Sequence, residues 1–217
     1  MSIKKIPQDF GLIAPYAAWM VLMTALPATV GGYAARTVVV AALLAAAWLG
    51  RKTKDVRREP CLSSSVSRPL ASSVSCLASS ILPGFLVGLA VFAIWILPEQ
   101  FDWAWYRKFC IVGEGGTQAV AEASAAMIAI RLVGSAFVIS VAEELFFRKW
   151  LIGFAGFWWM VGLFAVEHDR WLVGAVAGMV YGGLYLRKGL LSAIVAHATT
   201  NLVLGLWVLK TGQWQFW

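Results

Sequence analysis

Long apolar segments separated by short polar stretches occupy most of the chain. Most of the apolar segments approach the ~20 residues that a helix needs to cross a bilayer, because a helix rises about 1.5 Å per residue. We therefore predict an all-α polytopic membrane protein with about seven transmembrane helices in one bundle, forming a single integral-membrane domain over residues 1–217. The predicted helices are residues 10–30, 33–49, 81–97, 128–154, 157–166, 171–186 and 190–209.

Two longer polar stretches lie between predicted helices. Residues 51–80 begin with a basic cluster and continue into a Ser-rich segment with little helical periodicity, which predicts a cytoplasmic loop. Residues 98–122 mix Trp and Tyr with charged residues and a Gly-Gly pair, which predicts a segment at the membrane interface. The motifs that carry candidate chemistry come later, within residues 128–209.

The overall composition agrees with a chain dissolved in lipid. Hydrophobic residues make up 60% of the 217 residues, charged residues make up 13%, and the mean hydropathy is +0.76. Soluble domains carry roughly 45–50% apolar and about 25% charged residues, so the composition argues against a soluble enzyme and a disordered chain. The three cysteines are scattered without a C-x-x-C pair, which argues against a disulfide framework and a cysteine zinc site.

The formal net charge of +7 is explained by orientation in the membrane. If the N-terminus is cytoplasmic, 12 of the 18 Lys and Arg residues lie on the cytoplasmic side, as the positive-inside rule favours. These are Lys4, Lys5, Arg51, Lys52, Lys54, Arg57, Arg58, Arg68, Arg148, Lys149, Arg187 and Lys188. We therefore predict a cytoplasmic N-terminus and a lipid bilayer, rather than nucleic acid, around the basic residues.

Ionisable residues inside predicted helices gather in the last third of the chain. Such residues are expensive to bury in lipid, so each is a candidate functional residue. They occur in the segments VAEELFFRKW, FAVEHDRW and VAHATTNLV, which contain the two histidines of the chain, His168 and His197. Counting helical rise from the predicted turns places Glu143, the histidines and Asn201 in one layer near the middle of the membrane.

Helical spacing sorts these residues onto faces. Glu144 and Arg148 are four residues apart and therefore face each other, which neutralises two charges inside the membrane. Glu143 points about 100° away from that pair and is left free. His197 and Asn201 share one helix face by the same four-residue spacing.

The segment around the first histidine repeats this spacing. Phe164 lies four residues before His168, so its ring is expected to separate the histidine from lipid. Glu167 is predicted to be solvated. Asp169 and Arg170 are predicted to form a loop at the end of a helix.

A free carboxylate with a histidine favours hydrolysis by an activated water. Glu143 and His168 can together deprotonate a water for attack on a carbonyl. His197 and Asn201 can donate hydrogen bonds to the developing oxyanion. This constellation needs no serine or cysteine nucleophile, and we predict neither a cofactor nor a metal.

Two alternatives stay open at this point. A zinc hydrolase could use Glu143, His168 and His197 as ligands, because zinc takes His and carboxylate ligands with one open position. The lack of an H-E-x-x-H motif argues against it. A non-catalytic membrane scaffold or immunity protein could use the same polar cluster only to hold its helices together.

The order of three short motifs resembles that of the CAAX-protease and bacteriocin-processing (CPBP, also called ABI) family of intramembrane peptidases. The CAAX prenyl endopeptidase is a member of this family. The resemblance covers roughly residues 132–207. The motifs are EExxxR at Glu143, Glu144 and Arg148, FxxxH at Phe164 and His168, and HxxxN at His197 and Asn201.

The resemblance implies a metal-independent, glutamate-type endopeptidase that cleaves a membrane-associated peptide or protein. It implies that Glu143 and His168 activate water and that the HxxxN pair, His197 and Asn201, forms the oxyanion hole. More loosely, the segment FFRKWL and the overall layout resemble CAAX-protease-related proteins that accompany bacterial exosortase systems. The expected location is therefore the bacterial inner (plasma) membrane.

Overall fold

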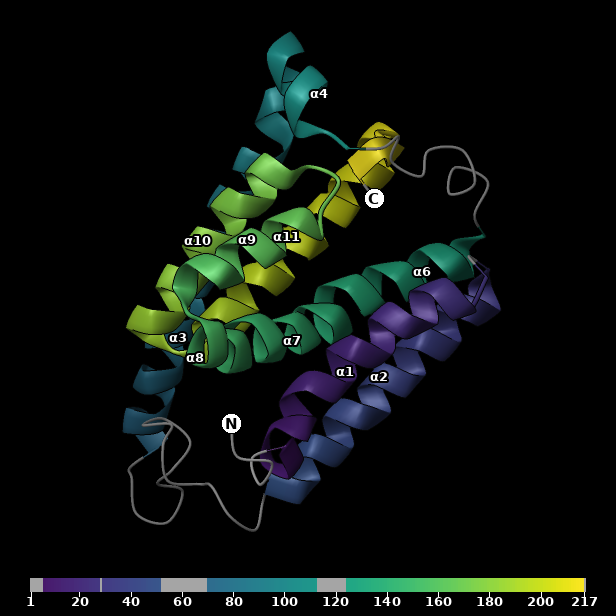
Figure 1. Cartoon of the computed structure of the whole chain (residues 1–217). Helices are drawn as coiled ribbons and strands as arrows, with labels where there is room; N and C mark the ends of the chain where they lie inside the picture. Colours follow the sequence, from purple (N-terminus) through teal and green to yellow (C-terminus); the bar gives the residue numbers. More distant parts are fainter. Residues whose placement is uncertain (1–5, 28, 52–69, 113–123, 217) are drawn as a thin grey trace.

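The computed structural model describes residues 6–27, 29–51, 70–112 and 124–216 (Figure 1). Within these ranges the chain is helical and forms no β-strand, and an isolated antiparallel bridge joins Ile111 and Arg170. The first half comprises α1 (Ile6–Ala25), α2 (Val30–Arg51), α3 (Leu70–Gln100) and α4 (Ala104–Cys110). The second half comprises α6 (Ala125–Val133), η2 (Gly134–Ile139), α7 (Ser140–Glu143), η3 (Glu144–Leu151), α8 (Ile152–Ala155), α9 (Phe157–Val166), α10 (Trp171–Lys188), α11 (Leu190–Thr211) and η4 (Trp214–Phe216).

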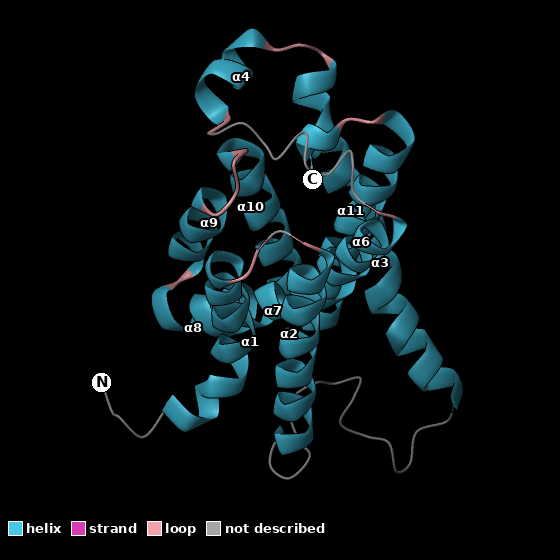
Figure 2. Cartoon of the chain, turned by 90° about the vertical axis from the view of Figure 1, so that its right-hand side faces the viewer, coloured by secondary structure: helices cyan, strands magenta, loops and turns pink. Residues whose placement is uncertain are grey.

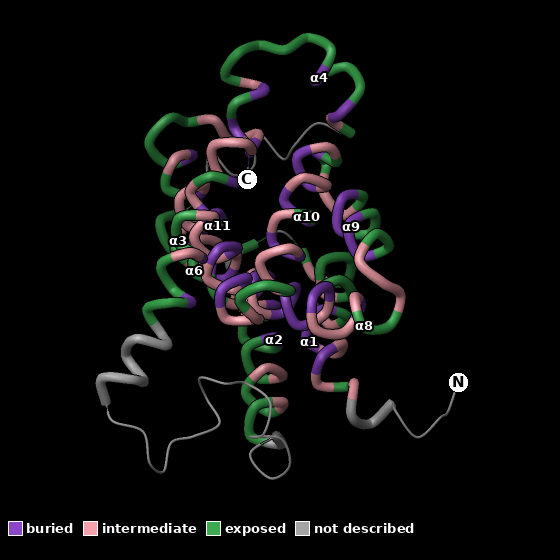
Figure 3. Tube along the Cα trace, turned by 90° about the vertical axis from the view of Figure 1, so that its left-hand side faces the viewer, coloured by how far each residue is buried: buried purple, intermediate pink, exposed green. Residues whose placement is uncertain are grey.

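The helices form two packed groups that meet along one long rod. α6 to α8 continue one another as this rod, with the α1–α2 hairpin on one side and α3, α9, α10 and α11 on the other (Figures 1 and 2). The central apolar core joins Tyr16, Val91, Phe147, Phe164 and Ala196, which come from five different elements. Buried positions concentrate in the middle of the molecule, whereas much of α2 is exposed (Figure 3). The core therefore brings the first helix against the motif-bearing helices.

The outer surface is that of an integral membrane protein. Among the described residues, four helical stretches are long and apolar enough to cross a membrane, at residues 31–49, 78–100, 125–155 and 190–211. Large apolar side chains lie exposed on several helices, including Phe137, Trp158 and Trp159. Water would oppose such exposure, whereas lipid favours it.

Most predicted helices are found, and one predicted loop is partly wrong. Each of the seven predicted apolar segments contains a helix, but the first, residues 10–30, extends too far, because α1 ends at Ala25 and α2 begins at Val30. The Ser-rich part of residues 51–80 was expected to be a loop, but α3 begins at Leu70 and residues 70–80 are its first turns. Serine is only a moderately weak helix former, and the following apolar run extends the helix backward through it. Residues 52–69 of this predicted loop lie outside the described residues.

The predicted interfacial stretch, residues 98–122, begins inside a helix. α3 continues through Gln100, and the short helix α4 follows at Ala104–Cys110. Residues 113–122 lie outside the described part of the chain. Figure 1 places α4 at the end of the molecule opposite α8.

Two glycines with positive φ make the tight turns before α9 and α11. Gly156 has φ 98° and Gly189 has φ 89°, a region that other residues rarely adopt. The α8–α9 turn lies on the same side of the molecule as the first turn of α1, away from α4 (Figure 1). The predicted turns near these positions are therefore confirmed.

The rod contains two π-helical sections, η2 and η3. A π-helical turn accommodates an extra residue and is frequently found at functional sites. Glu143 is the last residue of α7, and Glu144 is the first residue of η3. The EExxxR motif therefore lies at the junction between the two helical geometries.

α3 and α11 approach closely because glycines line α3 at the contact. A Cβ atom on Gly88 would lie 2.5 Å from the Ala196 carbonyl oxygen and 2.6 Å from Thr199 Cβ. The Thr200 hydroxyl donates to the Gly88 carbonyl oxygen at 2.8 Å. Close packing through small residues and hydroxyl hydrogen bonds is typical of membrane helices.

Gly88→Ala is expected to lower the free energy of unfolding by about 1–3 kcal/mol, because the added methyl group forces α3 away from α11. Chemical unfolding in detergent micelles measures this loss. Gly183→Ala is the matched control, since a Cβ on Gly183 meets no atom within 4 Å. If both variants unfold alike, the close contact is not important for stability.

Candidate active site

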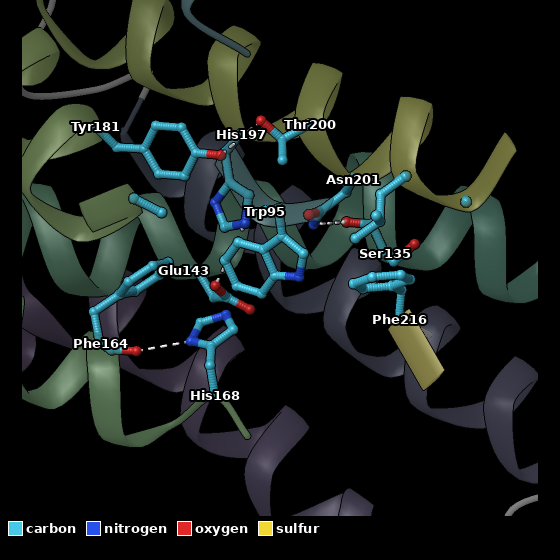
Figure 4. A pocket seen from close by; sticks show the side chains of 13 residues that line it. Trp95, Ser135, Glu143, Phe164, His168, Tyr181, His197, Thr200, Asn201 and Phe216 are labelled. Atoms are coloured by element: carbon cyan, nitrogen blue, oxygen red, sulfur yellow. Dashed lines mark hydrogen bonds and ion pairs between the residues drawn. The ribbon is translucent and has the colours of Figure 1, made fainter. Parts of the chain in front are cut away.

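One cavity brings together the four predicted catalytic side chains. It has a volume of about 180 Å³ and is lined by Glu143, His168, His197 and Asn201 together with residues from α3, η2 and the C-terminus (Figure 4). These four residues come from α7, the turn between α9 and α10, and α11. They lie around one cavity, while their predicted depth in the membrane stays a prediction.

The Glu144–Arg148 pair is fully buried and contacts residues that line the cavity. Arg148 Nη1 lies 3.1 Å from Glu144 Oε1, and both side chains are 0% exposed. The Arg148 guanidinium also stacks over the Phe164 ring, 4.1 Å from its centroid. The pairing predicted from helical spacing is therefore confirmed, and Phe164 contacts the pair as well as the histidine.

His197 hydrogen-bonds to the same glutamate. Its Nδ1 atom lies 2.8 Å from Glu144 Oε1. A carboxylate held by an arginine is an acceptor, so the Nδ1–H group donates to it. The ring also stacks on Tyr181, with centroids 5.0 Å apart and an interplanar angle of 20°. Its orientation is thus fixed on two sides.

Glu143 extends toward the cavity without a hydrogen-bond partner. Its side chain is buried, and within the described part of the chain the Oε2 atom has no donor in range. His197 Nε2 lies 3.7 Å from this Oε2 atom. A buried polar atom left unsatisfied is costly, and such atoms are typical of sites that bind a water or a substrate.

His168 lies in the turn between α9 and α10. Its Nδ1–H group donates to the Phe164 carbonyl oxygen at 2.7 Å, which leaves Nε2 as the acceptor. Burial lowers the pKa of His168 to about 4, so the ring is neutral near pH 7. The Phe164 ring lies 4.6 Å from the imidazole, as the spacing predicted.

Asn201 uses its amide hydrogens within the protein. Nδ2 donates to the Ser135 carbonyl oxygen at 3.1 Å and to Ser140 Oγ at 3.2 Å. Ser140 Oγ itself donates to the same carbonyl at 3.0 Å. The Asn201 side chain therefore stabilises the π-helical section η2, and in this geometry both of its N–H groups are occupied.

Three aromatic residues of the site were missed by the sequence analysis. Trp95 from α3 packs edge-on against His168, with centroids 5.3 Å apart. Tyr181 from α10 donates from its hydroxyl to Thr200 at 2.7 Å, and Phe216 from η4 lines the cavity. Trp95 and Phe216 resemble the many other aromatics of this chain, so only Tyr181, a polar residue in a glycine-rich helix, offered a signal.

Glu167 is partly buried, so the prediction that it is solvated is wrong. Its Oε2 atom is inaccessible and has no hydrogen-bond partner among the described residues. Burial raises the pKa of Glu167 to about 7, while a hydrogen bond from Tyr16 opposes the shift. Helix α1 covers this side of the turn, an arrangement that the local sequence does not reveal.

Arg170 anchors the turn that carries His168. It lies in the predicted loop at a helix end, but it is buried and forms an ion pair with Glu99 of α3. Its guanidinium also lies 4.7 Å from the centroid of the Phe216 ring. These contacts connect the turn to α3 and to the C-terminal segment, so three parts of the chain hold His168 in place.

Comparison with known proteins identifies one family. The family described as "Rce1-like: Type II CAAX prenyl endopeptidase Rce1-like" matches residues 125–203, from the start of α6 into α11. No curated protein and no solved structure matches the chain. The match confirms the resemblance to CAAX-type peptidases and covers all three motifs. In the described residues, no three His, Cys, Asp or Glu side chains are grouped so as to hold a metal ion.

Proposed function

Because residues 125–203 are Rce1-like, we propose that this protein is an intramembrane endopeptidase that hydrolyses a peptide bond of a membrane-associated peptide or protein. The family match supports a CAAX-type membrane endopeptidase in general. The proposal adds the mechanism: a water activated by Glu143 and His168 attacks the peptide carbonyl, with His197 and Asn201 stabilising the oxyanion.

The observation that carries the proposal is the unpartnered carboxylate of Glu143. It lies in the cavity with His168 and His197, between the two rings in Figure 4. Glu144 differs from Glu143, because Arg148 and His197 both contact its Oε1 atom. A carboxylate that no arginine neutralises, beside imidazole acceptors, is the arrangement that general-base activation of water requires.

The chemistry then runs in two steps. A water held between Glu143 and His168 Nε2 loses a proton as its oxygen attacks the carbonyl carbon, and the carbonyl electrons move onto oxygen. The C–N bond then breaks, and the amine nitrogen receives the proton. Asn201 can assist the oxyanion only if a substrate displaces one of its two hydrogen bonds to Ser135 or Ser140.

The cavity favours a short apolar segment of substrate. At about 180 Å³ it is smaller than the ~300–1,000 Å³ typical of drug-sized ligand sites. Trp95, Ala177, Leu204 and Phe216 supply apolar walls around the polar centre. A peptide side chain and a water fit such a volume. Whether the substrate carries a prenyl group is left to experiment.

The experiment uses the full-length protein in lipid nanodiscs with quenched fluorescent peptides anchored in the same bilayer, with and without a prenyl group. Cleavage that persists in the presence of a chelator is the expected result. Cleavage abolished by the chelator and restored by zinc would favour the metal-hydrolase alternative. Absence of cleavage for every anchored peptide would contradict the enzyme and favour a scaffold or immunity role.

We also propose that all seven predicted segments lie in the bilayer of a bacterial inner membrane with the N-terminus in the cytoplasm. The α8–α9 turn and the first turn of α1 lie on the same side of the molecule, which supports this arrangement (Figure 1). Basic residues Arg187 and Lys188 end α10 on that side. One-sided chemical labelling of intact cells tests the orientation.

A further inference from the structure

The hydrogen-bond network assigns His197 a definite protonation state. Arg148 lies 3.1 Å from Glu144, and both side chains are fully buried, so the carboxylate is held in its ionised, accepting form. His197 Nδ1 lies 2.8 Å from that carboxylate and must carry the hydrogen. A neutral imidazole has one N–H group. Its Nε2 atom therefore carries a lone pair and no hydrogen before substrate binds.

This lone pair faces the candidate base. Nε2 of His197 lies 3.7 Å from Glu143 Oε2, and no donor in the described chain satisfies that oxygen. The distance exceeds that of a direct hydrogen bond, but such contacts are often long before substrate binds and shorten in the complex. A proton that reaches Glu143 can therefore pass to His197 Nε2, the ring nitrogen that does not face Glu144.

The two histidines differ in what lies behind them. His168 Nδ1–H donates to the neutral carbonyl of Phe164, whereas His197 Nδ1–H donates to the carboxylate of Glu144. A carboxylate behind an imidazole stabilises the imidazolium that forms when the opposite nitrogen takes a proton. His197 is therefore the better carrier of a positive charge.

No preformed donor to an oxyanion is left among the two residues of the HxxxN motif. Both Nδ2 hydrogens of Asn201 are given to Ser135 and Ser140. His197 Nε2 carries no hydrogen at rest. The charged and titratable groups that face His197 are Glu143, Glu144 and Arg148 from the rod, Tyr181 from α10 and His168 from the α9–α10 turn.

We infer that Glu144 is a positioning residue that holds His197 with a bare Nε2, and that His197 becomes an oxyanion donor only after it accepts the proton of the attacking water. The inference rests on the proposed function. Glu143 takes the proton from water as the O–C bond forms and transfers it to Nε2. The imidazolium N–H then donates to the oxyanion. When the C–N bond breaks, the same proton goes to the amine and His197 returns to its neutral form.

The direct test is nitrogen-15 NMR of the full-length protein labelled at histidine in nanodiscs, without substrate. The chain has two histidines, so in His168→Asn the two ring-nitrogen signals both belong to His197. The expected spectrum at pH 7 shows a neutral ring protonated at Nδ1 and bare at Nε2. A ring protonated at Nε2, either neutral or as the imidazolium, would overturn the inference. This measurement needs no activity, so its failure is distinct from failure of the proposed function.

The second test removes the Glu144 carboxylate together with the Arg148 guanidinium, so that no unpaired charge stays buried. In Glu144→Gln combined with Arg148→Met, the amide oxygen can still accept from Nδ1–H, but it does not stabilise the imidazolium. We expect kcat to fall by at least about 100-fold with KM nearly unchanged, and the pH at which His197 protonates in the NMR titration to fall. A purely structural role for Glu144 predicts neither change in a folded variant, and retention of kcat would overturn the inference.

Discussion

Replacing Glu143 by Gln is expected to lower kcat for peptide cleavage by about 10³-fold while the protein stays folded. The amide cannot accept a proton from water, and general-base catalysis contributes typically 10²–10⁴-fold. Folding should survive because Glu143 Oε2 has no hydrogen-bond partner in the described chain to lose. Initial rates on the anchored peptides, together with the unfolding transition in detergent, measure both effects.

The control for this variant is a carboxylate far from the cavity. Asp9 lies in the first turn of α1, and Asp9→Asn removes the same charge without touching the site. Its kcat should equal that of the unmodified protein. Activity of Glu143→Gln at the level of the control would exclude Glu143 as the base.

Arg148→Ala is expected to lower the free energy of unfolding by about 3–5 kcal/mol, because it leaves an uncompensated buried charge on Glu144. Glu144 is 0% exposed, and Arg148 is its ion-pair partner at 3.1 Å. The variant also loses the contact of the guanidinium with the Phe164 ring. Unfolding curves in detergent micelles measure the loss.

The double variant Glu144→Gln with Arg148→Met serves as the matched control for stability. Replacing both members of a buried ion pair by uncharged residues often changes the free energy of unfolding little, whereas removing one member lowers it strongly. The double variant should therefore recover most of the stability that Arg148→Ala loses. Arg148→Ala as stable as the unmodified protein would contradict the buried pair.

The features that local spacing determines could be predicted from the sequence. The pairing of Glu144 with Arg148 and the contact of Phe164 with His168 depend on residues four apart in a helix, so they are fixed once the helix forms. The helices were predictable from the apolar segments, because the length and composition of a segment are local properties. The turn at Gly156 was predictable because glycine, which has no Cβ atom, readily adopts the positive φ that the turn requires.

The features that depend on packing between helices were not predictable. The hydrogen bond from His197 to Glu144 joins residues 53 positions apart. Trp95 reaches His168 only because α3 packs beside α10 and α11, and nothing distinguishes it from other tryptophans in the sequence. The partial burial of Glu167 likewise depends on α1, which lies far away in the chain.

The helix that begins at Leu70 is a different kind of error. The serines after it weakened the apolar pattern, and the pattern was interpreted as a loop. The backbone instead continues the helix of the following apolar run, because helix elongation is easier than a new start. Local composition was therefore a poor guide to the boundary, although it identified the helix itself.

The most direct test of the central claim is hydrolysis in heavy-oxygen water under single-turnover conditions, with the products identified by mass spectrometry. Wild-type protein in nanodiscs should release a peptide whose new C-terminal carboxylate carries one heavy oxygen, and Glu143→Gln should release almost none in the same time. Equal product from Glu143→Gln, or a cleaved peptide without heavy oxygen, would contradict a water activated by Glu143.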